Sequence, residues 1–212
     1  MSVRDSQSFV PALKALVFVL ALVPLARLAV ALAFFPDWLG ANPAEFITRS
    51  LGDWTLRFLL ATLAVTPLRV LTGWHWLLRL RRMLGLYAFF YGVVHLSSYV
   101  AFDQLFSVPE ILRDIAKRPF ITVGFTTLVL MIPLAATSTN AMVRRLGAKR
   151  WLALHRLVYV IGPLAVLHFW WMVKRDVTQP AIYGLILALL LGYRVLARRR
   201  GRRGSVPAPA TR

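Results

Sequence analysis

Cysteine is absent from this chain of 212 residues. Its absence excludes disulfide bonds, thiolate metal sites, cysteine-held iron–sulfur clusters and cysteine nucleophiles. Any redox chemistry of the protein must therefore come from a bound cofactor. The sequence also lacks a Gly-x-Gly-x-x-Gly run and a phosphate-binding loop. We therefore expect no nicotinamide- or nucleotide-binding domain within the chain.

Acidic residues are scarce, with 8 Asp and Glu against 26 Lys and Arg, for a formal net charge of +18. Charged residues make up 16% of the chain and hydrophobic residues 58%, a composition that excludes intrinsic disorder. The basic residues alternate with long apolar runs. This pattern argues against a partnership with nucleic acid and favours a membrane protein.

Six apolar stretches are each long enough to cross a bilayer core, which takes about 20 helical residues. They predict an all-α integral membrane protein, a six-transmembrane helical bundle over residues 1–200, followed by a basic disordered tail over 201–212. The first stretch is too long for the apolar core of a cleaved signal peptide. The expected spans are residues 13–35, 54–71, 83–102, 120–136, 151–173 and 181–197.

The charges between the spans predict their orientation. The loops 72–82 and 137–150 carry clusters of Arg and Lys and no acidic residue, and the C-terminal tail is strongly basic. In the loops 36–53 and 103–119 the acidic residues match or outnumber the basic ones. Because positively charged loops stay in the cytoplasm, we expect both termini to be cytoplasmic. The basic tail also suits contact with anionic membrane lipid.

Three of the four histidines fall inside the expected spans: His95 in the third, and His155 and His168 in the fifth. Ionisable residues inside a membrane are costly and usually functional, and imidazole is a common haem ligand. His95 and His168 share a level in the outer half, whereas His155 lies about 20 Å nearer the cytoplasm. We expect His95 and His168 to clamp an outer haem iron, and His155 to be the ligand of an inner haem where a second haem is bound.

The 13-residue spacing of His155 and His168 does not fit a straight helix. Thirteen residues at about 100° each leave His168 rotated about 220° from His155, so one straight helix would not point both inward. We expect a bend at Gly162-Pro163 to restore the phase, because proline removes a helix hydrogen bond and kinks the chain.

The expected position of a second inner ligand holds no histidine. Arg81 and Arg82 stand there instead, so the inner iron is either five-coordinate or has an unusual sixth ligand. Arg81, Arg82 and Arg156 are alternatively partners for haem propionates, since guanidinium groups suit carboxylates. Anchoring to the cytoplasmic surface is the competing interpretation. Arg27 and Arg57 are the outer-haem counterparts, with snorkelling to the interface as their alternative role.

Two motifs are more specific than these spacings: RRMLGLYAFFYGVVH over 81–95 and LHRLVY over 154–159. Through them nearly the whole chain resembles the MsrQ family, the haem-binding membrane subunits of bacterial periplasmic protein-methionine-sulfoxide reductase systems. More broadly, it resembles the ferric-reductase-like transmembrane domain of NADPH oxidases. The resemblance implies one or two b-type haems held by His95, His155 and His168. It also implies FMN as a further cofactor, a location in the bacterial inner membrane and a periplasmic molybdopterin-containing reductase as partner.

The oxidase relatives carry a fused flavin and nicotinamide domain, which this chain lacks. The resemblance therefore implies that electrons come from the quinone pool or from a separate cytosolic flavin reductase. The predicted function is that of a b-type cytochrome, a non-catalytic electron-transfer subunit that supports repair of oxidised periplasmic proteins. Loops 36–53 and 103–119, with the stretch Pro109–Pro119, are the expected docking surface, or else that stretch is an interfacial helix.

Two other interpretations of the membrane histidines stay open. One is a small six-span secondary transporter or channel that uses the membrane His and Arg residues as an ion path. The other is a purely structural role, in which each imidazole forms an interhelical hydrogen bond. A purified protein without colour would favour the transporter.

Overall fold

The computed structural model describes residues 3–173 and 175–203, and every regular element in these ranges is helical. Within this part, six helical segments are long and apolar enough to cross a membrane: residues 9–34, 43–72, 75–103, 119–136, 148–172 and 178–197. The expected six-span, all-α fold is therefore confirmed. The elements are α1 (Val3–Phe34), η1 (Pro36–Leu39), α2 (Pro43–Thr72), η2 (His75–Leu77), α3 (Leu78–Ser98), η3 (Tyr99–Asp103), α4 (Val108–Lys117), α5 (Pro119–Ala136), α6 (Asn140–Leu146), α7 (Ala148–His155), α8 (Val158–Met172) and α9 (Thr178–Arg203).

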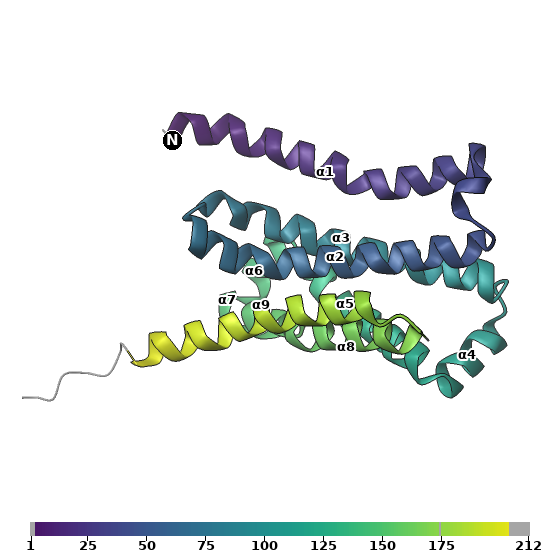
Figure 1. Cartoon of the computed structure of the whole chain (residues 1–212). Coiled ribbons are helices and arrows are strands. Elements are labelled where there is room, and N and C mark those ends of the chain that lie inside the picture. Colours follow the sequence, from purple (N-terminus) through teal and green to yellow (C-terminus); the bar gives the residue numbers. More distant parts are fainter. Residues whose placement is uncertain (1–2, 174, 204–212) are drawn as a thin grey trace, which may run out of the picture.

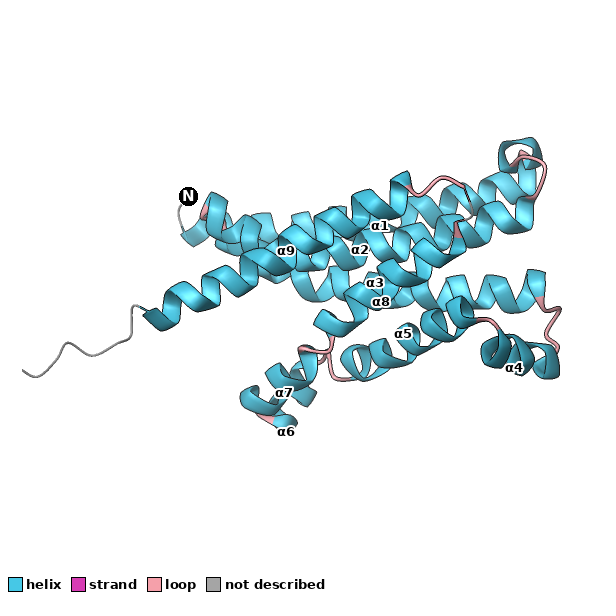
Figure 2. Cartoon of the chain, turned by 60° about the horizontal axis from the view of Figure 1, so that its bottom comes forward, coloured by secondary structure: helices cyan, strands magenta, loops and turns pink. Residues whose placement is uncertain are grey.

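The bundle is built on two closely packed helix pairs, α2 against α3 and α5 against α8. Helix α9 packs on α8 and α2, and α1 lies along the outer side of the α2–α3 pair (Figure 1). The described chain begins and stops at the same end of the bundle, which we call the terminal end. The short helix α4 lies at the opposite end, which we call the α4 end (Figure 1 and Figure 2).

The core lies where α2, α3 and α8 meet. Leu51, Leu63, Tyr91 and Ile161 are almost completely buried there. The hydroxyl of Tyr91 donates a hydrogen bond of 2.6 Å to the Ala21 carbonyl and so attaches α1 to the pair. The outward faces expose large apolar side chains, among them Leu71, Leu185 and Leu189. An apolar exterior is what a bilayer requires, because lipid tails surround the protein there.

The second span begins eleven residues earlier than predicted. The sequence places residues 36–53 in a loop, whereas α2 starts at Pro43. Asn42 caps this helix, because its side-chain oxygen accepts a hydrogen bond of 3.2 Å from the Glu45 backbone N–H. Pro43 suits the first helical turn, and Arg49 pairs with Glu45 one turn later at 2.6 Å. Polar capping chemistry thus extends the helix beyond its apolar run.

The fifth span is broken, but not at the predicted place. Gly162 and Pro163 both lie inside the continuous helix α8. The break is a tight turn at Arg156-Leu157, where each backbone N–H donates to the carbonyl three residues earlier. Such a turn advances about 120° per residue in place of about 100°. This extra winding recovers part of the rotation that a straight helix lacks between His155 and His168.

The loop 103–119 and the C-terminal segment also contain helix. Residues 108–117 form the amphipathic helix α4, which agrees with the interfacial-helix alternative for Pro109–Pro119. Helix α9 continues to Arg203, so the first three residues of the expected disordered tail are helical. The remainder of that tail, 204–212, lies outside the described residues.

Candidate functional site

His95 on α3 and His168 on α8 face each other across the bundle. Their ring centres are 6.2 Å apart and the ring planes are inclined by 71°. Both rings are half-buried, and both line the same cavity at the α4 end. The prediction that these two histidines share a level on the third and fifth spans is confirmed.

Backbone carbonyls orient both imidazoles. His95 Nδ1 donates to the Thr48 carbonyl of α2 at 2.8 Å, and His168 Nδ1 donates to the Phe120 carbonyl of α5 at 2.7 Å. A carbonyl only accepts, so the proton of each neutral ring is on Nδ1. Each Nε2 is left with its lone pair available to a metal, which is the usual arrangement of a metal-binding histidine with an outer hydrogen-bond partner.

Two glycines make room for these rings. A Cβ atom added at Gly124 of α5 would lie only 2.6 Å from His168 Cε1. One added at Gly52 of α2 would lie 3.1 Å from His95 Cε1. Each imidazole therefore packs directly on the backbone of a neighbouring helix, and no larger residue fits beneath either ring without displacement.

The space between the rings fits one metal ion. Two metal–nitrogen bonds of about 2 Å, and about 1 Å from each nitrogen to its ring centre, total about 6 Å, close to the observed separation. Room for a flat macrocycle extends to both sides of the pair. A cavity of about 270 Å³, which we call the α4 cavity, lies on one side. A cavity of about 110 Å³ beside Gly52 and Leu56 lies on the other.

His155 lies apart from this pair, in a cavity of about 300 Å³ near the terminal end, which we call the terminal cavity. Its ring stacks on Trp151 with 3.9 Å between ring centres, and its Nδ1 donates to the Trp151 carbonyl at 3.0 Å. Its Nε2 atom is buried and has no hydrogen-bond partner among the described residues. A buried nitrogen of this kind is expensive unless a ligand engages it.

The arginines predicted near the inner site divide into two groups. Arg81 and Arg82 line the terminal cavity with His155, and Arg82 Nη1 also donates to Asn140 Oδ1 at 2.7 Å. Arg156 is exposed in the turn before α8 and does not line that cavity. Its proposed contact with an inner haem is therefore not supported by its position.

The two arginines predicted for the outer haem lie outside the cavities that contain His95. Arg57 donates to the Tyr183 hydroxyl at 2.9 Å and stacks over Trp54, and neither Arg57 nor Arg27 lines a cavity that contains His95. Arg118, at the start of α5, lines the α4 cavity instead, together with Tyr99 and Asp103. Sequence reasoning missed these three residues, because the turn η3 places Tyr99 and Asp103 on the cavity wall and the packing of α4 brings Arg118 there.

Comparison with known proteins agrees with this geometry. The family model described as ferric reductase like transmembrane component matches residues 51–166, a range that includes His95 and His155. A protein of Herminiimonas arsenicoxydans is 57% identical over 197 residues, covering 92% of this chain and 89% of its own length. A protein of Ralstonia nicotianae is 56% identical over 202 residues, covering 94% and 92%. Both are named protein-methionine-sulfoxide reductase heme-binding subunit MsrQ.

The chain belongs to the MsrQ family. A further MsrQ protein, from Azospira oryzae, is 54% identical over 201 residues, which cover 94% of this chain and 85% of its own length. The family and the six spans together make this chain a multi-pass protein of the bacterial inner membrane. No solved structure matches the chain.

Proposed function

We propose that this chain is a haem-carrying electron-transfer subunit of a methionine-sulfoxide reductase system. The observation that carries the proposal is the His95–His168 pair. The ring centres are 6.2 Å apart, and both Nδ1 atoms are hydrogen-bonded to backbone carbonyls. A b-type haem supplies reversible one-electron chemistry when bound. His95 and His168 would hold the haem through imidazoles that the backbone carbonyls already orient, and the apolar surroundings would exclude water and tune its potential.

His155 marks a second site on the other side of the bilayer. Its Nε2, which has no partner among the described residues, would hold an inner haem in the terminal cavity. Arg81 and Arg82 line the same cavity, where their guanidinium groups would balance the propionates. None of the residues that line this cavity besides His155 is a histidine, which supports an inner iron with one imidazole ligand.

The direction of electron flow follows from the charge pattern. The terminal end carries the basic loops 72–82 and 137–150, so we place it in the cytoplasm, where quinol or a flavin reductase is the donor. The α4 end then faces the periplasm and docks the molybdopterin-containing reductase that acts on oxidised protein methionine. Identity above 50% to proteins named as MsrQ subunits supports this partnership.

Optical spectra of the purified protein test the proposal. In detergent, the wild type should show haem bands that sharpen on reduction with dithionite. His95→Ala and His168→Ala should each remove the signal of the six-coordinate haem, and His155→Ala should remove only the inner-haem signal. His75→Ala is the matched control, because His75 is exposed in η2 and lines neither histidine cavity.

The spectra also separate the alternatives. A colourless wild-type protein would reject the electron-transfer proposal and favour a transporter. Unchanged spectra in both His95→Ala and His168→Ala would reject the ligand pair. Loss of haem in His75→Ala equal to that in His95→Ala would show that the histidine effects are not specific to the site.

A further inference from the structure

Polar side chains from the segment 99–118 line one part of the α4 cavity. Helix α3 ends in the wide turn η3, which places Tyr99 and Asp103 on the cavity wall. Helix α4 then crosses this end of the bundle (Figure 2) and adds Ile111 and Ile115 to the same wall. Arg118 follows α4 directly and is also on the wall. Five residues of the continuous segment 99–118 thus line the cavity that also contains His95 and His168.

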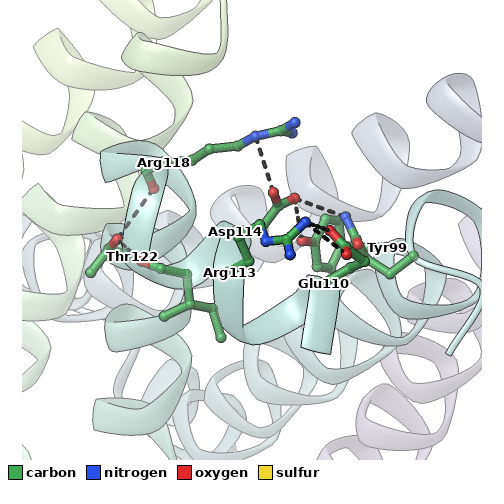
Figure 3. Close-up of polar contacts among 8 residues, drawn as sticks. Tyr99, Glu110, Arg113, Asp114, Arg118 and Thr122 are labelled. Carbon is green, nitrogen blue, oxygen red and sulfur yellow. Dashed lines mark hydrogen bonds and ion pairs between the residues drawn. The ribbon is translucent and has the colours of Figure 1, made fainter. Parts of the chain in front are cut away.

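Asp114 is the centre of a polar network within this segment. It is a buried carboxylate, only 9% exposed as a residue. Its Oδ2 accepts from the Tyr99 hydroxyl at 2.9 Å and from Gln104 Nε2 at 2.8 Å. Its Oδ1 lies 3.2 Å from Arg118 Nε, and Figure 3 shows the guanidinium of Arg118 reaching back over α4 to it. The Asp114 carboxylate is held by two donors besides Arg118, so it gives the Arg118 side chain a fixed partner on one side.

Arg118 is held by its Nε atom, which leaves its two terminal nitrogens facing away from Asp114. Among the described residues, no hydrogen bond or ion pair involves these terminal nitrogens. A guanidinium presents its donors as a planar fork that matches a carboxylate. Arg118 is therefore oriented at the cavity wall with donors available for a second, incoming carboxylate.

The other outer arginines are differently placed. Arg49 reaches the smaller cavity on the opposite side of the histidines, but its Nη2 is already 2.6 Å from Glu45. Arg113, on α4, pairs with Glu110 at 2.9 Å and does not line the α4 cavity. Asp103 lines the cavity as well and disfavours a carboxylate on its own side. These contacts leave Arg118 as the best-placed partner for an acidic group in this cavity.

We propose that Arg118 binds a propionate carboxylate of the outer haem, and that Asp114 is the positioning residue that orients its guanidinium. The inference rests on the proposed function, since it requires haem between His95 and His168. It replaces Arg27 and Arg57 as outer propionate partners. It also gives the segment 99–118 a role in setting the redox potential. A cation beside the haem favours the reduced form, so removing or misplacing that cation lowers the midpoint potential.

Three variants test the proposal in the purified full-length protein. Arg118→Gln should lower the midpoint potential of the six-coordinate haem and shift its propionate bending mode in resonance Raman spectra. Asp114→Asn should shift the same Raman mode, because Arg118 loses its orienting partner. Arg113→Gln is the matched control, since it removes the same charge five residues away from a side chain of similar exposure that does not line the α4 cavity, and it should leave both quantities unchanged.

Each outcome decides the proposal. Shifts in Arg118→Gln and Asp114→Asn, but not in Arg113→Gln, support it. An unchanged Raman mode and potential in Arg118→Gln, with haem bound normally, would overturn it while the proposed function stands. Equal potential shifts in Arg118→Gln and Arg113→Gln would also overturn it, because they indicate a general charge effect. A fourth variant, Arg49→Gln, tests the smaller cavity. If it alone shifted the Raman mode and the potential, the propionate would lie in that cavity and the proposal would be overturned. Absence of haem from the wild type would instead reject the proposed function.

Discussion

Substitution of Gly124 by alanine is the sharpest test of how His168 is held. The added Cβ would lie 2.6 Å from Cε1, 2.7 Å from Nδ1 and 3.1 Å from Nε2 of the His168 ring. Carbon atoms in contact are ordinarily about 3.5–4.0 Å apart, so the ring must retreat by about 1 Å. A binding geometry tolerates errors of only about 0.5 Å. The retreat also pulls His168 Nδ1 from the Phe120 carbonyl, now at 2.7 Å.

The expected result is a graded series. Gly124→Ala should weaken haem binding on the order of 10–100-fold, as loss of a supporting contact to a metal ligand typically does. Gly52→Ala should have a smaller effect, because its Cβ would lie 3.1 Å from His95 Cε1 and the ring needs to move only a few tenths of an ångström. Gly192→Ala is the control, because no atom lies within 4 Å of its added Cβ. All three glycines are helical, so each variant gains similar helix propensity, up to about 1 kcal/mol.

The haem-to-protein ratio of purified protein, with the reduced spectrum, measures the series. Wild-type haem content and spectrum in Gly124→Ala would refute the reasoning, because the ring would then have another place to go. Equal losses in Gly124→Ala and Gly192→Ala would refute it as well, since the effect would not depend on contact with His168.

Two further predictions concern stability and pH. Tyr91→Phe should lower the free energy of unfolding in detergent by about 1 kcal/mol, because it removes the buried hydrogen bond to the Ala21 carbonyl; an unchanged unfolding curve would contradict this. Hydrogen bonds from the Thr178 side chain and, to a smaller extent, from its backbone N–H lower the pKa of Asp176 below its ordinary value. The stabilisation from this contact is thus present above the unfolded pKa of about 3.9 and is lost as pH falls through the lower folded pKa. Asp176→Asn should therefore be less stable than wild type at pH 7, and the difference should vanish in acid; a difference that is independent of pH would contradict the assignment.

Most of the fold could be predicted from apolar runs, since a span needs a minimum length of hydrocarbon-compatible residues. The helix ends could not, as α2 illustrates. Asn42 and Glu45 are a capping pair that the sequence displays, but the apolar run begins only near Trp54. Hydropathy alone therefore assigned the first eleven residues of α2 to a loop.

The sequence predicted how deep the histidines lie along the spans, but not the direction in which their side chains point. Counting along the helices places His95 and His168 at one level, because the rise per residue is nearly constant. The direction of a side chain depends on local winding, and the tight turn at Arg156-Leu157 carries no proline that would announce it. The position of Arg118 likewise depends on the packing of α4 against α5. Contacts between elements of this kind leave no periodic trace in a single sequence.

The turn at Arg156-Leu157 has a consequence for how the two sites are adjusted. His155 belongs to α7, which rests on α5 and α6, whereas His168 belongs to α8, which packs along α5 and α9. A substitution that tilts α7 therefore acts first on the surroundings of His155, and it reaches His168 only through α5, which packs against both helices, or through the turn itself. If each site holds a haem as proposed, the turn gives sequence change near His155 a route to adjust one potential with less effect on the other.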